Sequence, residues 1–227
     1  MRLDPIGDLR YSNFATAVSY HRQKDKKQIL MLGDSRIAHW YPLPEYERIQ
    51  VIQAGFAGFT SKQIDLLQHQ FMEMIEPEVV ILEVGINDIK SIGLFTDRRE
   101  QILERIKHHL DSIVKQWHQH GIHVMILTVF PNGPCPLLRR PVWSETISQD
   151  IDIINSYIKT MSSGQTTIID CDTILKHGGF IRKEYQKDEL HLNQKGYEQL
   201  NKVLMPYIEQ YIQSISSLDA RSAVLPL

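Results

Sequence analysis

The stretch that decides the fold is QILMLGDS, residues 28–35. Its apolar part, Gln28 to Leu32, is short and ends in Gly33, which suits a buried strand better than a helix of normal length. Four similar runs follow along the chain, and we expect a strand in each. They span Ile49 to Gln53, Glu78 to Glu83, His123 to Thr128 and Thr166 to Asp170.

Helical patterns separate these runs. The longest is placed from Thr96, as its N-cap, to Gly121, and its apolar residues recur every three or four positions. Further helices are expected from about Ser61 to Glu76, Ile147 to Met161 and Gln194 to Ile212, with one near the N-terminus from Ser12 to Lys24. Strands that alternate with helices predict an α/β fold in which helices cover both faces of a parallel sheet.

Length and composition are those of one ordinary domain. The chain has 227 residues, of which 42% are hydrophobic, and we expect a single domain over residues 1–227 with its core at about 28–213 and a frayed tail at 214–227. A net charge of −2 with dispersed charges gives no basic surface for nucleic acid.

Location is predicted from what the sequence lacks. No segment approaches the roughly 18 to 20 apolar residues of a membrane helix, and the N-terminus has no apolar signal region. Cys135 and Cys171 are expected to be free thiols, which favours a reducing compartment. We therefore expect a cytoplasmic protein without an integral membrane segment.

Chemically useful residues follow the predicted strands. Ligands of open parallel sheets bind beyond the carboxyl ends of the strands, so these positions are the ones to examine for function. The segments are Gly33-Asp34-Ser35, Ala54-Gly55-Phe56-Ala57-Gly58, Gly85-Ile86-Asn87-Asp88 and Asp188-Glu189-Leu190-His191. A nucleophile, small backbone donors, an amide and a His with a carboxylate would meet at one edge.

Together the four segments resemble the four sequence blocks of the SGNH/GDSL hydrolase family, in the family's order over about residues 29 to 197. The run His191-Leu192-Asn193 with Gly196-Tyr197 extends the last block. The resemblance implies a three-layer α/β/α sandwich with five parallel strands in a flavodoxin-like order. The competing Gly-x-Ser-x-Gly elbow of α/β-hydrolases is disfavoured, because Ile37 stands where its second glycine is needed.

The resemblance also implies the roles of the site residues. Ser35 would be the nucleophile, His191 the general base and Asp188 the group that orients the histidine. The oxyanion donors would be the backbone N–H groups of Ser35 and Gly58 and the side-chain amide of Asn87, with Gly55 as the other glycine available.

The expected reaction is hydrolysis of a carboxylic ester through an acyl-serine intermediate, without metal or organic cofactor. A small acyl group is favoured, such as O-acetyl on a carbohydrate. Acyl thioesters and lysophospholipids are the alternatives within the family. A non-catalytic ligand-binding module of the same fold, or acyl transfer to an acceptor other than water, also remains open, and oligomeric state is not predicted.

Other notable residues are given structural roles. Asp34 and Asp88 are expected to support their loops by hydrogen bonding. Arg36, where the family often has Leu, is expected to alter the floor of the site, and Gln53 replaces a frequent Asn. The histidines near Gly121 are assigned to a helix end rather than to a metal. Residues 129–146 form a long connection that could shape a substrate pocket.

Overall fold

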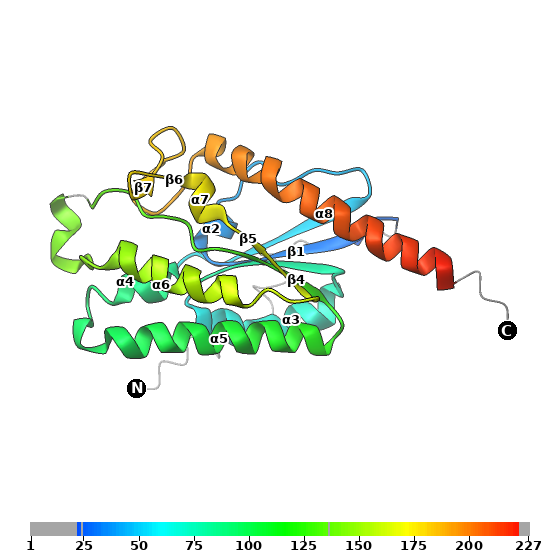
Figure 1. Ribbon diagram of the computed structural model, residues 1–227, viewed down its shortest axis with the longest axis horizontal. Coiled ribbons are helices and arrows are strands. Elements are labelled where there is room, and N and C mark those ends of the chain that lie inside the picture. Colours follow the sequence, from blue (N-terminus) through cyan, green and yellow to red (C-terminus); the bar gives the residue numbers. More distant parts are fainter. Residues whose placement is uncertain (1–21, 24, 136, 223–227) are drawn as a thin grey trace.

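The computed structural model describes residues 22–23, 25–135 and 137–222, and a five-stranded parallel sheet forms its centre (Figure 1). The strands lie in the order β2-β1-β3-β4-β5, and every neighbouring pair is parallel. Their bounds are β1 (Lys27–Gly33), β2 (Ile49–Gly55), β3 (Val79–Glu83), β4 (His123–Leu127) and β5 (Thr166–Ile169). All five predicted strands and the flavodoxin-like order are confirmed.

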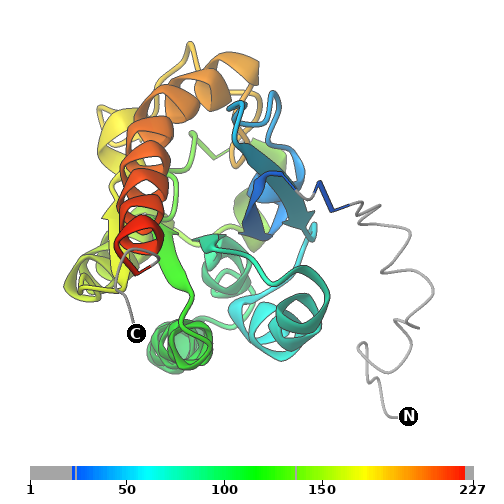
Figure 2. The same ribbon diagram turned by 90° about the vertical axis from the view of Figure 1, so that its right-hand side faces the viewer.

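Helices cover both faces of this sheet, as Figures 1 and 2 show. One face carries α3 (Ser61–Ile75), α4 (Ile86–Ser91), α5 (Arg99–Gln119) and α6 (Ile147–Thr160), and the other carries α2 (Ser35–Ala38), α7 (Cys171–Leu175) and α8 (Gln194–Ser222). Short elements complete the chain, namely the 3-10 helices η1 (Thr96–Arg98) and η2 (Leu137–Val142) and the hairpin strands β6 (Lys176–His177) and β7 (Phe180–Ile181).

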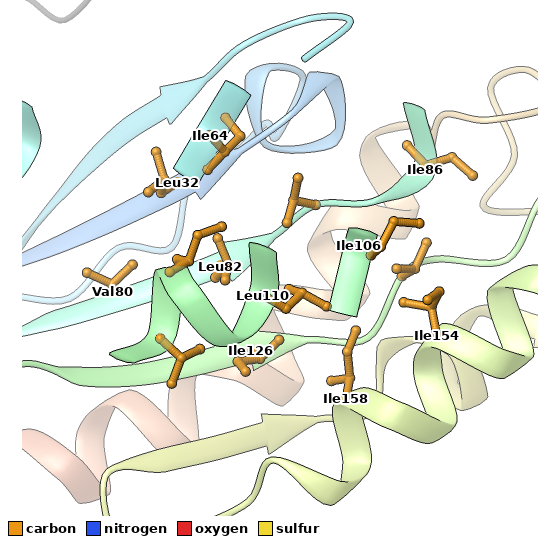
Figure 3. Packing of buried hydrophobic residues seen from close by; sticks show 14 of the residues in the cluster. Leu32, Ile64, Val80, Leu82, Ile86, Ile106, Leu110, Ile126, Ile154 and Ile158 are labelled. Carbon is orange, nitrogen blue, oxygen red and sulfur yellow. The ribbon is translucent and has the colours of Figure 1, made fainter. Parts of the chain in front are cut away.

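The core has two halves because successive residues of a strand point to opposite faces of the sheet. In β1, Leu30 and Leu32 pack with residues of α3, α5 and α6, whereas Ile29 and Met31 pack with residues of α8. Figure 3 shows the first half, in which Leu110 of α5 lies near the strands. Fully burying each such side chain stabilises the fold by about 1.5–3 kcal/mol. The packed sheet therefore gives the site described below a rigid support.

The expected N-cap of the longest helix is wrong. Thr96 lies inside η1, and the residue that caps α5 is Arg98, without a side-chain hydrogen bond. The N–H of Arg98 bonds the carbonyl of Phe95 over 3.0 Å, so a tight helical turn already precedes the α-helix. The predicted stop is confirmed, since α5 ends at Gln119 and Gly121 adopts a left-handed φ of 73°.

The two ends of the chain also differ from expectation. Helix α8 continues to Ser222, so fraying from Ser214 is wrong over the described residues. After Pro206, which the helix accommodates, no glycine or proline interrupts the sequence before Pro226, and nothing local stops the helix earlier. The expected helix from Ser12 to Lys24 falls largely outside the described residues, and Arg22 and Gln23 are not helical.

Candidate active site

Ser35 is held by a sharp turn between β1 and α2. Asp34 caps the helix, and its Oδ1 accepts a hydrogen bond from the N–H of Arg36 over 2.9 Å. Gly33 is required for close packing, because a Cβ there would lie 2.0 Å from the carbonyl oxygen of Glu83. Ser35 is therefore the first residue of α2, at the carboxyl edge of the sheet, and not the helix cap itself.

Three side chains from distant segments form a chain of hydrogen bonds at this edge. Ser35 Oγ lies 2.9 Å from Nε2 of His191, and Nδ1 of the same ring lies 2.9 Å and 3.0 Å from the two carboxylate oxygens of Asp188. The serine and the histidine are 156 positions apart in the sequence. The structure thus brings together the three residues predicted for the chemistry, in the predicted order of contact.

Asp188 also organises the turn that presents His191. Its Oδ1 accepts the N–H groups of Leu190 and His191, both over 2.9 Å. Partial burial alone would raise the pKa of Asp188, but these bonds and the contact with the ring outweigh it and lower the pKa below its usual value. The carboxylate is accordingly ionised at neutral pH and can hold a proton on Nδ1 of His191.

The predicted oxyanion donors Gly58 and Asn87 follow β2 and β3, the two neighbours of β1, at the same carboxyl edge of the sheet as Ser35. The Asn87 Nδ2 donates one hydrogen bond to the carbonyl of Phe59 over 2.9 Å, which orients the amide and leaves its second N–H for a ligand. Gly58 has a φ of 83°, which favours glycine, and within the described part of the chain no hydrogen bond to its N–H is found. As the first residue of α2, Ser35 has no acceptor for its N–H within the helix.

Gly55, the other glycine of the second segment, has a packing role. It is the last residue of β2 and pairs with Gly33, and a Cβ at Gly55 would lie 2.0 Å from the backbone nitrogen of Ala38. Gly58, in contrast, has open space around its Cα and lines the same pocket as Asn87. The geometry therefore favours Gly58 over Gly55 as the donor.

A family model and several solved structures match this chain. The model of the GDSL-like lipase/acylhydrolase family matches residues 32–199, which include every segment described above. The chain belongs to this family. No curated protein matches the chain.

Solved structures with the same fold have low sequence identity to this acylhydrolase. A GDSL-like lipase from Bacteroides thetaiotaomicron is 19% identical, with a TM-score of 0.67 over 88% of this chain and 98% of that one. A carbohydrate acetylesterase family member from Sinorhizobium meliloti is 13% identical, with a TM-score of 0.65 over 82% and 99%. An acetylxylan esterase from Geobacillus stearothermophilus is 16% identical, with a TM-score of 0.57 over 79% and 93%.

Family membership confirms the expectation of a carboxylic ester hydrolase. The match begins in β1 and ends in α8, so it spans all four segments that resemble the family blocks. The roles assigned to individual residues stay predictions that rest on the geometry above.

The expected loop supports are present in this acylhydrolase. Asp34 caps α2, and Asp88 accepts hydrogen bonds from the backbone N–H and the hydroxyl of Ser61, over 2.8 Å and 3.0 Å. Gln53 donates from Nε2 to the carbonyls of Ile37 and Trp40, over 2.7 Å and 3.1 Å, and so closes the end of α2. These polar side chains fix the backbone around Ser35 and Asn87.

Sequence reasoning missed His39. Its ring packs edge-on against that of His191, with 4.9 Å between the ring centres. Burial lowers the pKa of His39, and the neighbouring His191 lowers it further, so His39 is neutral at neutral pH. The spacing from Ser35, four residues along a helix, was the available signal, because such residues share a helix face.

Arg36 is also placed differently from expectation. Its side chain is fully buried and does not line the floor of the site. The guanidinium pairs instead with Glu83 at the end of β3, with 3.4 Å between Nη1 and Oε1. Arg36 can therefore affect the activity of the acylhydrolase only through the residues that it contacts.

A cavity of about 410 Å³ opens beside the oxyanion donors. Its lining combines apolar and polar residues, namely Gly58, Thr60, Asn87, Lys90, Ser91, Leu94, Arg139, Val142 and Trp143. The last three belong to residues 129–146, the connection expected to shape a pocket, and Arg139 is tied to Glu189 by an ion pair. A larger cavity, of about 630 Å³, lies at the start of β2 and contains none of the predicted site residues.

Within the part of the chain that the structure describes, no three His, Cys, Asp or Glu side chains are grouped as they would be around a metal ion. His118 and His120 contact backbone carbonyls of Gln165 and Gln116, in keeping with a role at the end of α5. Cys171 is a buried thiol that forms no disulfide. None of the described helices is long and apolar enough to span a membrane.

Proposed function

We propose that this acylhydrolase is a serine esterase that hydrolyses carboxylic esters through an acyl-serine intermediate. The observation that carries the proposal is the hydrogen-bond chain from Ser35 through His191 to Asp188. A serine hydroxyl is a weak nucleophile until a base removes its proton, and His191 Nε2 lies at the right distance to do so.

In the first step Ser35 Oγ attacks the ester carbonyl while His191 takes the hydroxyl proton. The N–H groups of Ser35 and Gly58 and the amide of Asn87 stabilise the negative oxygen that forms. His191 then gives its proton to the leaving alcohol, which departs and leaves Ser35 acylated. A water molecule then gives a proton to His191 and attacks the acyl carbon, and as the bond to Ser35 Oγ breaks, His191 returns the proton to Oγ and the carboxylic acid is released.

The cavity beside Asn87 is a candidate binding site for the acyl group of the ester. His191 must protonate the alcohol, so the alcohol leaves on the side of the histidine, which faces His39. The cavity is lined by Gly58 and Asn87, two of the predicted oxyanion donors, but not by Ser35, His39 or His191. We therefore assign the cavity to the acyl group.

Two acyl classes are candidates. O-acetyl on a carbohydrate is the first, supported by the lack of a long apolar segment in the sequence and by the acetylesterases among proteins of this fold. A longer acyl group, as in acyl thioesters or lysophospholipids, is the second. It is favoured by the cavity volume, because pockets of about 300–1,000 Å³ hold ligands much larger than acetyl.

The experiment is hydrolysis of p-nitrophenyl acetate, butyrate and octanoate by the wild type and by Ser35→Ala, with a chelator present. We expect activity that disappears in the variant, together with labelling of Ser35 by a fluorophosphonate probe. Full activity in Ser35→Ala would contradict the mechanism. Ligand binding without turnover or labelling would favour the non-catalytic module, and the preferred chain length separates the two acyl classes.

A further inference from the structure

Three buried ionisable side chains lie in or against the turn that carries the nucleophile, and the esterase mechanism uses none of them. Asp34, Arg36 and Glu83 are each fully inaccessible to solvent. They come from the turn after β1 and from the last residue of β3. Burying charge is costly unless it is paired and hydrogen-bonded, so a cluster of this kind calls for a functional explanation.

The Arg36 guanidinium joins segments that are far apart in the sequence. Its Nε donates a hydrogen bond to the backbone carbonyl of Leu190 over 3.1 Å, and its Nη1 contacts Glu83. The flat group also lies over the ring of Phe130, with 5.1 Å between Cζ and the ring centre. One side chain thus connects the nucleophile turn, the end of β3 and the loop that carries the histidine.

The bond to Leu190 has a direct consequence for His191. The carbonyl of Leu190 and the N–H of His191 belong to one planar peptide group. Arg36 binds the carbonyl end of this group, and Asp188 accepts the N–H end over 2.9 Å. The peptide that carries the histidine is therefore held at both ends, which limits rotation of the ring toward or away from Ser35.

On the nucleophile side, Arg36 is fixed through its backbone. Its N–H donates to Asp34, and its carbonyl accepts a hydrogen bond from the hydroxyl of Tyr197 over 2.9 Å. Arg36 directly follows Ser35 in the chain. Its main chain is therefore fixed next to the nucleophile, and its guanidinium is bound to the peptide of the base, His191.

We propose that Arg36 is a positioning residue that holds His191 at hydrogen-bond distance from Ser35 by binding the Leu190–His191 peptide. This inference rests on the proposed function. An arginine suits the task because its planar group presents donors in several directions, one to a carbonyl and another to a carboxylate. Leucine, often found here in the family, has no donor, and lysine has a single nitrogen that cannot occupy both positions.

The surrounding acids keep the buried charge balanced. Burial raises the pKa of Glu83 well above its usual value, and the carboxylate of Asp34 raises it further. Burial raises the pKa of Asp34 as well, although Arg36 opposes this. The buried cluster therefore disfavours two carboxylate charges beside one guanidinium. A glutamine at position 83 keeps a side-chain oxygen that can accept a hydrogen bond from Nη1 of Arg36.

The test compares Arg36→Leu and Arg36→Lys with two control variants in the same cluster. Glu83→Gln keeps an oxygen that can accept from Arg36 Nη1, and Tyr197→Phe removes a bond to the Arg36 backbone but leaves the guanidinium in place. Steady-state kinetics with a p-nitrophenyl ester are measured well below each Tm. We expect both Arg36 variants to lose about 10- to 100-fold in kcat, as for a small misplacement of a catalytic group, with KM within threefold. The controls should keep kcat within twofold.

A second measurement does not depend on turnover. We expect the proton between His191 and Asp188 to give a low-field proton NMR signal in the wild type and both controls, and this signal to be absent from folded Arg36→Leu and Arg36→Lys. A folded Arg36→Leu that keeps both kcat and this signal would overturn the proposal. Should Arg36→Leu not fold, the same two readouts on Arg36→Lys decide. A wild type without esterase activity would sink the proposed function alone, since the NMR comparison still tests Arg36.

Discussion

Asp188 contacts His191 at two places, the backbone N–H and the ring. Its Oδ1 accepts the N–H over 2.9 Å, and both of its carboxylate oxygens lie within 3.0 Å of Nδ1. The carboxylate therefore sets the position of the residue and also the ring nitrogen that carries the proton. With the proton on Nδ1, the free lone pair of Nε2 faces Ser35, as the base requires.

Asp188→Asn is expected to lower kcat by about 10⁴-fold, the loss known for the equivalent change in the serine-protease triad. The amide can still accept a hydrogen bond from the backbone, but the wrong ring tautomer is favoured. The measurement is kcat for p-nitrophenyl acetate together with Tm. A variant that folds normally and keeps kcat within tenfold of the wild type would remove Asp188 from the mechanism.

Asn87→Ala is expected to lower kcat by roughly 10²–10³-fold, because one donor to the oxyanion is lost. The neighbouring Asp88→Asn is the matched control. Asp88 accepts bonds from Ser61, and an asparagine can accept the N–H and donate to the hydroxyl, so its kcat should stay within a few fold of the wild type. Equal losses in the two variants would indicate that loop structure, not oxyanion binding, is affected.

Leu94→Trp is expected to narrow the cavity beside Asn87 and to shift the preference among esters toward acetate. Leu94 lines this cavity and is 63% exposed, so a larger side chain can be accommodated without disturbing the core. The ratio of kcat/KM for octanoate to that for acetate should fall at least tenfold. Leu66→Trp, at an exposed position on α3, is the control and should leave the ratio unchanged. An unchanged ratio in Leu94→Trp would place the acyl group elsewhere.

The sheet was predictable because parallel strands buried on both faces are nearly continuous apolar runs. Residues 28–33 already contain this signal, and the glycine at the end of the run marks the turn to the nucleophile. Element ends were harder to place. Thr96 is a residue type that is common at helix N-caps, yet it lies in a 3-10 turn that precedes α5. The last turns of α8 have no sequence pattern that distinguishes them from a frayed tail.

The candidate site was predictable to the extent that its residues lie in short blocks. Ser35, Asn87 and His191 each follow a strand or belong to a recognisable segment, so their meeting at one edge follows from topology. The buried contact of Arg36 with Glu83 and Leu190 was not predictable, because it joins positions 47 and 154 residues apart with no local pattern. A single sequence gives no signal from which such long-range side-chain contacts can be predicted.

The pH dependence of stability is expected to differ between the wild type and Asp88→Asn. Burial raises the pKa of Asp88 from 3.8 to about 6, although hydrogen bonds from Ser61 oppose the shift. Because the folded pKa is the higher one, the neutral acid is favoured in the folded protein. Its contribution to stability is complete below pH 3.8 and is lost as pH rises toward about 6.

Asparagine cannot ionise, so the variant escapes this loss. The free energy of unfolding of Asp88→Asn minus that of the wild type should rise between pH 4 and 6 and then level off. Urea denaturation at pH 4.5, 5.5, 6.5 and 7.5 measures this difference, in which the contributions of all other titrating groups, including Glu83, cancel because both proteins contain them. A difference that stays constant across this range would mean that Asp88 is already ionised in the folded protein at pH 4.5, and that its bonds to Ser61 outweigh its burial.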